Sequence, residues 1–162
     1  MQLSFRGPWI VSNFDFRALN PGALGVQRHR GVDPPERIKT RYPISMNSGV
    51  YLAIFHLPHT RTIVIGRLGR FTLRQGFYLY VGSAQRNLES RLTRHSRRHK
   101  PLRWHIDYLS TKAPMVGALV LRGPKNWECR LAAIMAKHYP LPIARFGASD
   151  CRCSGHLFFC QA

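Results

Sequence analysis

Two side chains suited to phosphate chemistry lie on one face of a predicted helix. Leu88, Arg91, Leu92 and His95 are spaced i, i+3, i+4 and i+7, so they project from the same side. The two leucines would seat the helix on a sheet, while the guanidinium and the imidazole face the same way. A guanidinium binds phosphate oxygens with bidentate geometry, and an imidazole titrates near neutral pH. Beside a strand that ends in tyrosine, the pair predicts a site for a phosphate diester.

One carboxylate further along the chain is placed to hold a metal ion. Asn126 is predicted to cap a second helix, and Glu128 falls in its first turn. The apolar stripe of this helix consists of Trp127, Leu131, Ile134, Met135 and His138. We therefore expect Glu128 to face inward and to need a partner. Magnesium is commonly held by one or two carboxylates plus phosphate and water, so one glutamate suffices. The alternative is that Glu128 only compensates the helix dipole.

The segment from Phe146 to His156 concentrates polar and sulfur-bearing side chains. Its candidate structural or zinc-binding residues are Asp150, Cys151, Cys153 and His156. The Cys-x-Cys-x-x-His spacing admits zinc, with Cys129, Asp150 or Cys160 as a fourth ligand. It is not the spacing of a standard zinc finger, and small buried thiols account for it as well. The four cysteines form no secreted disulfide framework and are expected to be reduced.

The elements that must position these side chains are short strands and helices. The predicted strands are Val50–Phe55, Thr62–Gly66, Arg70–Leu73, Gly76–Gly82 and Met115–Leu121. The first helix is predicted to begin at Asn87 as its N-cap and to end in the basic run 97–100 before Pro101. Residues 103–109 fit a helix or a strand equally well.

The order of these blocks resembles the GIY-YIG nucleases. The residues that carry the resemblance are Gly49-Val50-Tyr51, Tyr80-Val81-Gly82, Arg91, His95 and Glu128. The chain more closely resembles a small prokaryotic branch of this family, whose members are sometimes joined to an endonuclease III domain. Its further blocks correspond to Tyr80 to Ala84, Arg94-His95, Trp104 to Asp107 and Phe146 to Cys153. The resemblance covers residues 49–159 and implies an α/β fold with a small central mixed or antiparallel sheet flanked by helices.

The resemblance also implies a role for each site residue. Tyr51 or Tyr80 would deprotonate a water, Arg91 would contact the scissile phosphate, His95 would orient groups or relay a proton, and Glu128 would hold one Mg²⁺ or Mn²⁺. The predicted substrate-binding residues are Gly82, Ser83, Arg94, Arg97 and Arg98. A phenol with a pKa near 10 is ionised only about one part in a thousand at pH 7. Surrounding cations are therefore expected to lower the tyrosine pKa.

Two positions depart from the pattern of the family. Some members carry a lysine after the second glycine, where this chain has Ser83 and Ala84. The asparagine that often follows the metal-binding glutamate is missing, and Ser149 or Asp150 is the predicted substitute, bonded to a catalytic strand. These departures leave open a non-catalytic nucleic-acid-binding module with the same fold, and the charge would equally serve a ribosomal RNA partner.

The charge balance is that of a protein that binds a polyanion. The chain has 25 Lys plus Arg against 7 Asp plus Glu, a formal charge of +18. From Met46 onward, 18 basic residues face four acidic ones. The predicted partner is nucleic acid, DNA rather than RNA, and the resemblance adds association with a base-excision repair enzyme.

The length of 162 residues suits one folded domain. Residues 1–45 carry Gly-Pro, Asn-Pro-Gly and Pro-Pro turns without a sustained period, which predicts a disordered or misassigned extension before a nuclease domain at 46–162. Apolar residues between Trp9 and Phe16 leave room for one docking segment. No run of 18 apolar residues and no leader pattern is present, so we expect a cytoplasmic protein without a membrane partner.

Overall fold

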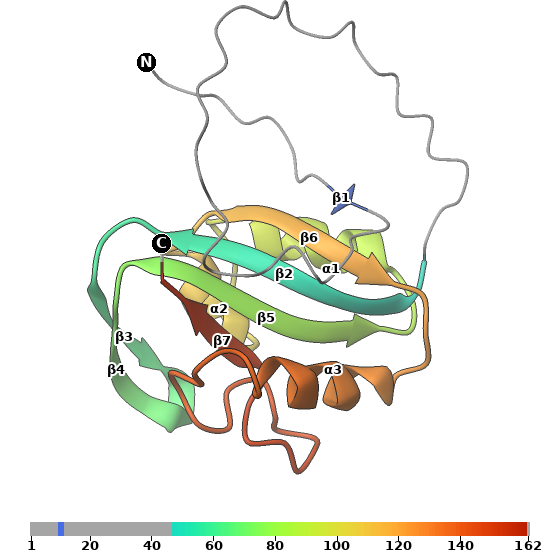
Figure 1. Ribbon diagram of the computed structural model, residues 1–162. Helices are drawn as coiled ribbons and strands as arrows, with labels where there is room; N and C mark the ends of the chain where they lie inside the picture. Colours follow the sequence, from blue (N-terminus) through green and yellow to red (C-terminus); the bar gives the residue numbers. More distant parts are fainter. Residues whose placement is uncertain (1–9, 12–46, 162) are drawn as a thin grey trace, which may run out of the picture. The chain divides into compact units, whose positions relative to one another are not determined.

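The computed structural model describes residues 10–11 and 47–161 (Figure 1). The elements in chain order are β1 (Ile10–Val11), β2 (Gly49–Leu57), β3 (Arg61–Ile65), the 3₁₀ turn η2 (Gly66–Leu68), β4 (Gly69–Leu73), β5 (Gly76–Ala84), α1 (Leu88–Ser96), α2 (His105–Ser110), β6 (Met115–Leu121), α3 (Trp127–Met135) and β7 (Leu157–Cys160). All five predicted strands form, and the ambiguous stretch 103–109 contributes a helix. Apart from β1, the predicted extension and its docking segment lie outside the described residues.

The central sheet has the strand order β1-β6-β2-β5-β7. Strands β6, β2, β5 and β7 pair antiparallel, and the two-residue β1 pairs parallel with β6. Strands β3 and β4 form a separate antiparallel hairpin. The prediction of a mixed α/β fold with a small, mainly antiparallel sheet is confirmed.

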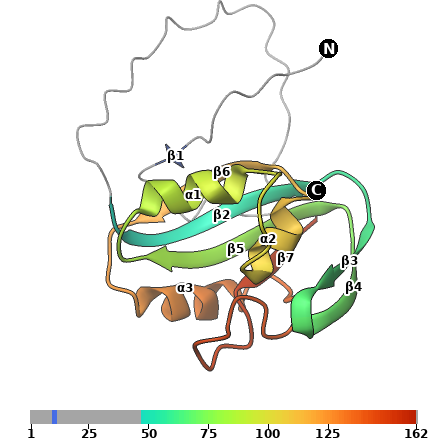
Figure 2. The same cartoon turned by 180° about the vertical axis from the view of Figure 1, so that it is seen from behind.

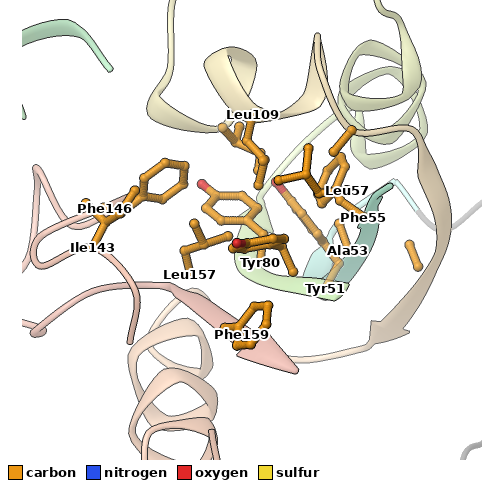
Figure 3. Close-up of a cluster of buried hydrophobic side chains, with 14 of the residues drawn as sticks. Tyr51, Ala53, Phe55, Leu57, Tyr80, Leu109, Ile143, Phe146, Leu157 and Phe159 are labelled. Carbon is orange, nitrogen blue, oxygen red and sulfur yellow. The ribbon is translucent and has the colours of Figure 1, made fainter. Parts of the chain in front are cut away.

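Helices cover both faces of this sheet (Figures 1 and 2). Helices α1 and α2 pack on the face that carries Tyr51, Phe55 and Tyr80, where Leu92 and Ile106 complete a buried cluster. Figure 3 shows Tyr51 and Tyr80 inside this first core. Because successive side chains of a strand point to opposite faces, the residues between them build a second core under α3. The members of this second core include Val50, Leu52, Val81, Leu131, Met135 and Phe158.

Helix α1 is shorter than predicted and is capped differently. Asn87 has a left-handed backbone (φ 54°, ψ 41°), and its side chain makes no capping hydrogen bond. The backbone N–H of Asn87 instead donates to Oδ1 of Asn47, at 2.6 Å. The helix ends at Ser96, so the basic run 97–100 lies beyond it. Asn87 is therefore the N-cap residue, as predicted, but the stabilising side chain at this end of the helix is that of Asn47. The predicted end in the basic run was wrong, because the helix stops one residue before it.

Helix α3 differs from its prediction in the same way. Asn126 makes no side-chain capping bond. Trp127 and Ile134 are 40% and 49% exposed, and His138 lies past the helix end. Of the predicted apolar stripe, only Leu131 and Met135 are buried against the sheet, together with Ala132.

Among the described residues, no helix has the length and the apolar character needed to cross a membrane.

Candidate active site

A gap at the edge of the sheet creates the site. Strand β7 pairs with β5 only between Phe77 and Tyr80, and one further bond joins the Val81 N–H to the carbonyl of His156. In the described part of the chain, no strand continues this pairing along residues 82–84. Side chains from the two faces of the sheet can therefore meet around the open end of β5.

A cleft of about 630 Å³ lies at this open end. The predicted site residues that line it are Tyr51, Tyr80, Gly82, Ser83, Arg91, His95, Glu128 and Asp150. Tyrosine, arginine and histidine come from the α1 face, and the glutamate comes from α3 on the other face. The cleft thus brings together the phenols, the guanidinium and the carboxylate that the sequence singled out.

The two tyrosines are diagonal neighbours on adjacent strands. Tyr51 lies opposite Gly82, and Tyr80 lies opposite Ala53, so both rings project from the same face. Their centroids are 6.4 Å apart. A Cβ on residue 82 would lie 2.5 Å from the Tyr51 hydroxyl oxygen, well inside normal contact distance. Gly82 is therefore the residue that lets the Tyr51 ring lie across β5.

His95 fixes the hydroxyl of Tyr51. Its Nε2 lies 2.7 Å from the Tyr51 oxygen, and both side chains are buried. The imidazole ring meets Tyr80 only edge to face, with centroids 5.9 Å apart. Burial, and next the positive charge of Lys100, lower the pKa of His95 to about 3. The ring is therefore neutral at pH 7.

The phenols are not activated in the way the sequence suggested. Burial raises the pKa of Tyr51 well above its usual value, and the neighbouring Tyr80 adds to this increase. Burial also raises the pKa of Tyr80, followed by the charge of Glu128. Arg91 lowers both values but does not outweigh burial. The expectation that cations lower the phenol pKa was wrong, because packing in the first core removes water from the rings.

Glu128 faces inward and has partners, as predicted. Its Oε2 accepts a short hydrogen bond from the Ser83 hydroxyl, and its Oε1 lies 3.0 Å from Nδ1 of His156. The side chain keeps 15% of its surface exposed. A carboxylate has about four acceptor positions, so two remain after these bonds. The residue therefore fits the role of a single protein ligand to a hydrated divalent ion.

Arg91 is held in the cleft by an aromatic ring. Its guanidinium carbon lies 4.8 Å from the ring centroid of Trp104, within the range of a cation–π contact. The sequence did not lead us to assign site roles to Trp104 or to six other lining residues, which are Gln85, Arg86, Arg103, His105, Lys125 and Gly147. The Trp-His-Ile-Asp block was the signal that could have identified Trp104 and His105.

Comparison with known proteins gives one family. Residues 50–162 match the family described as a domain of unknown function, DUF123. The chain belongs to the DUF123 family. Neither the curated proteins nor the solved structures contain a match to it.

Three predicted DNA-binding arginines of the DUF123 chain do not line the cleft. Arg94 donates to Oδ2 of Asp107 at 2.8 Å and to the carbonyl of Pro101. Arg97 and Arg98 are exposed beyond the end of α1. Arg94 therefore serves the fold, and the other two lie outside the site.

Asp107 anchors the segment that leads into α2. It is fully buried and accepts hydrogen bonds from the backbone N–H groups of Arg103 and Trp104 as well as from Arg94. Lys100 lies 3.4 Å from its Oδ1. Burial acts to raise the pKa of Asp107, but these donors and cations outweigh it and lower the value. The carboxylate stays charged and holds Trp104 in place under Arg91.

The predicted substitutes for the missing asparagine do not bond to a catalytic strand. Asp150 pairs with Lys125 at 3.3 Å, and both side chains are largely exposed. Ser149 is exposed at the rim of the cleft. Ser83 and His156 hold the glutamate instead, so the DUF123 domain supports Glu128 through other residues.

The sulfur-bearing residues gather behind the cleft. The ligand atoms of Cys129, Cys151, Cys153 and His156 all lie within 4.8 Å of one another. Of the three predicted fourth ligands, the structure places Cys129 here, rather than Asp150 or Cys160. The group is a set of donors of the kind that binds zinc, and it is chemically distinct from the oxygen ligands that Mg²⁺ prefers.

Proposed function

We propose that the DUF123 domain is a divalent-metal-dependent endonuclease of the GIY-YIG type that hydrolyses phosphodiester bonds in DNA. The observation that carries the proposal is the cleft in which Tyr51, Arg91, His95 and Glu128 converge from both faces of the sheet. Tyr51, helix α1 with Arg91 and His95, and Glu128 are distant from one another in the sequence, and Arg91 and Glu128 are not members of either hydrophobic core.

The cationic lining of the cleft would bind the phosphate backbone. Arg86, Arg91, Arg103 and Lys125 line it, against two carboxylates. Such a surface attracts DNA through counterion release, so binding should weaken steeply with salt. Stacked on Trp104, the Arg91 guanidinium is oriented in advance, which favours bidentate contact with the scissile phosphate.

Glu128 would hold the ion, and Tyr51 would manage the proton. A divalent ion supplies charge neutralisation at the phosphoryl oxygens and a polarised water. Tyr51 would accept a proton from the attacking water while its own proton passes to Nε2 of His95, 2.7 Å away. The resulting imidazolium is disfavoured by burial but favoured by the negative charge of the phosphate that enters beside it.

The test is cleavage of plasmid and branched DNA with Mg²⁺ or Mn²⁺. Glu128→Gln and Tyr51→Phe should each reduce the rate by about 10²–10⁴-fold. Glu89→Gln is the matched control, because Glu89 is exposed on α1 and does not line the cleft. Tyr80→Phe tests whether the second phenol can replace the first. Equal residual cleavage in wild type and all variants would indicate a contaminating nuclease and would refute the proposal.

A non-catalytic binding module is the second candidate. The raised pKa of both phenols favours it, because neither ring is ionised in the free protein. In this case wild type and Glu128→Gln would bind DNA with the same affinity and the same salt dependence, and neither would cut. Preferential capture of structured RNA over DNA would point to an RNA partner.

A further inference from the structure

The four donors behind the cleft converge from two separate segments. Cys129 lies in α3, while Cys151, Cys153 and His156 lie in the segment that leads into β7. These donor atoms fall within 4.8 Å of one another, and Sγ of Cys151 is 3.5 Å from Nε2 of His156. In a tetrahedral zinc site the donor atoms are about 3.5–3.8 Å apart. The side chains therefore need only small shifts to reach that geometry.

Neither core packing nor disulfide formation accounts for the cluster. The three cysteines are half-exposed, so they are not small apolar residues that fill a core. A disulfide joins two thiols, so disulfide formation within the cluster would leave one of its three cysteines unpaired. The remaining cysteine, Cys160, stays outside the group and contacts the carbonyl of Gln161. Three thiols and one imidazole nitrogen are a donor set that selects zinc over magnesium or calcium.

We propose that Cys129, Cys151, Cys153 and His156 bind one structural Zn²⁺, and that this ion orients Glu128 through His156. Four protein ligands complete a tetrahedron and leave no open position, as in structural rather than catalytic zinc sites. The binding site stands independently of nuclease activity. Only its consequence for cleavage depends on the function proposed above.

His156 links the zinc site to the cleft because its two nitrogens have different partners. Nε2 faces the thiols, and Nδ1 lies 3.0 Å from Oε1 of Glu128. Zinc on Nε2 requires the ring proton on Nδ1, which then donates to the carboxylate. The ring is 1% exposed, so this arrangement is shielded from water. His156 is therefore a positioning residue that fixes one oxygen of Glu128, while Ser83 fixes the other.

The surrounding chain is arranged to hold the ligands. Residues 136–156 contain neither helix nor strand and run between α3 and β7 (Figure 1). Arg145 organises the end of this segment: its backbone N–H donates to the Ser154 carbonyl, and its guanidinium donates to the Cys153 carbonyl at 2.8 Å. A metal ion would join the end of this long segment back to α3 at Cys129. Such a cross-link gives a long irregular segment a structural anchor.

The experiment measures metal content and then zinc affinity in the full chain. Wild type purified without chelator should contain one zinc per chain by elemental analysis. Cys153→Ser should lose it, while the matched control Cys160→Ser should keep it. Because Cys153→Ser could fail to fold, wild type is also reconstituted with Co²⁺, and the visible bands of tetrahedral cobalt thiolate should appear. Wild type that takes up neither metal, or a disulfide within the cluster by mass spectrometry, would overturn the site.

The link to Glu128 has its own measurement. Glu128→Ala removes the acceptor of the His156 proton and should weaken zinc binding by about 10–100-fold in a chelator competition. Glu128→Gln keeps a carbonyl acceptor and should retain most of the affinity. Unchanged affinity in Glu128→Ala would refute the coupling. Loss of cleavage with full zinc content in Glu128→Gln would support the nuclease, so the two proposals can fail separately.

Discussion

The protonation of His95 gives a prediction whose size follows from the structure. The pKa of this ring is about 3 in the folded protein, against about 6.5 in an unfolded chain. Because the folded value is the lower one, the unfolded chain binds the proton more tightly. The stabilisation by neutral His95 is complete above about pH 6.5 and is lost as the pH falls toward 3. Between about pH 7.5 and pH 5, the loss is about 2 kcal/mol.

The comparison variant is His95→Gln. A glutamine can still accept the Tyr51 hydroxyl proton but does not titrate. Urea denaturation of both proteins at the two pH values gives two changes in unfolding free energy. The wild type should lose about 2 kcal/mol more than the variant, while other titrating groups contribute alike to both. The charges around the ring are Lys100, Arg91 and Arg94, which lower its pKa, and Asp107, which raises it.

The result that would refute this reasoning is equal loss in the two proteins. A difference below about 0.5 kcal/mol would mean that His95 is not held neutral by burial. The charge of this ring would then follow the pH of the assay, as in an unfolded chain, and its burial would not keep it ready to accept the Tyr51 proton.

Three more predictions follow from contacts in and beside the cleft. Gly82→Ala should lower the unfolding free energy by about 1–3 kcal/mol in chemical denaturation, because its Cβ would meet the Tyr51 ring. In a Tyr51→Leu background the same substitution should cost almost nothing, and equal costs in the two backgrounds would contradict this. Asp107→Asn should destabilise the fold by about 3–5 kcal/mol in the same assay, because it leaves two buried or half-buried cations without their counter-charge, and a change below about 1 kcal/mol would argue against that pairing. Arg91→Ala should weaken DNA binding and reduce the slope of log affinity against log salt by about one, while Arg74→Ala, outside the cleft, should leave the slope unchanged; equal effects would show that the cleft is not the binding surface.

The sequence predicted the elements whose signal is local. Runs rich in β-branched and aromatic residues identified β2 and β5, and the spacing of Leu88, Leu92 and His95 identified the buried face of α1. These patterns depend on the fixed geometry of strand and helix, so they do not depend on what the strand or helix packs against. The inward direction of Glu128 was predictable for the same reason.

The features that could not be predicted depend on residues far apart in the chain. The N-terminus of α1 is held by Asn47, 40 residues before Asn87. The raised pKa of Tyr51 results from burial in the first core, which no local pattern encodes. Cys129 was one of three candidates for the fourth ligand, and only the packing of α3 selects it. The chemical roles given to these residues stay predictions that the experiments above must test.

The two hydrophobic cores divide the site into parts that can be damaged independently. A cavity made at Leu92 would loosen the support of His95 and, with it, the handling of protons. A cavity made at Leu131 would loosen α3 and, with it, the carboxylate and the thiol cluster. Partial-loss variants should therefore fall into two phenotypic groups, one corrected by raising the pH and the other by raising the metal concentration. Sorting random mutants by these two rescues would assign each mutated residue to one of the two faces of the sheet.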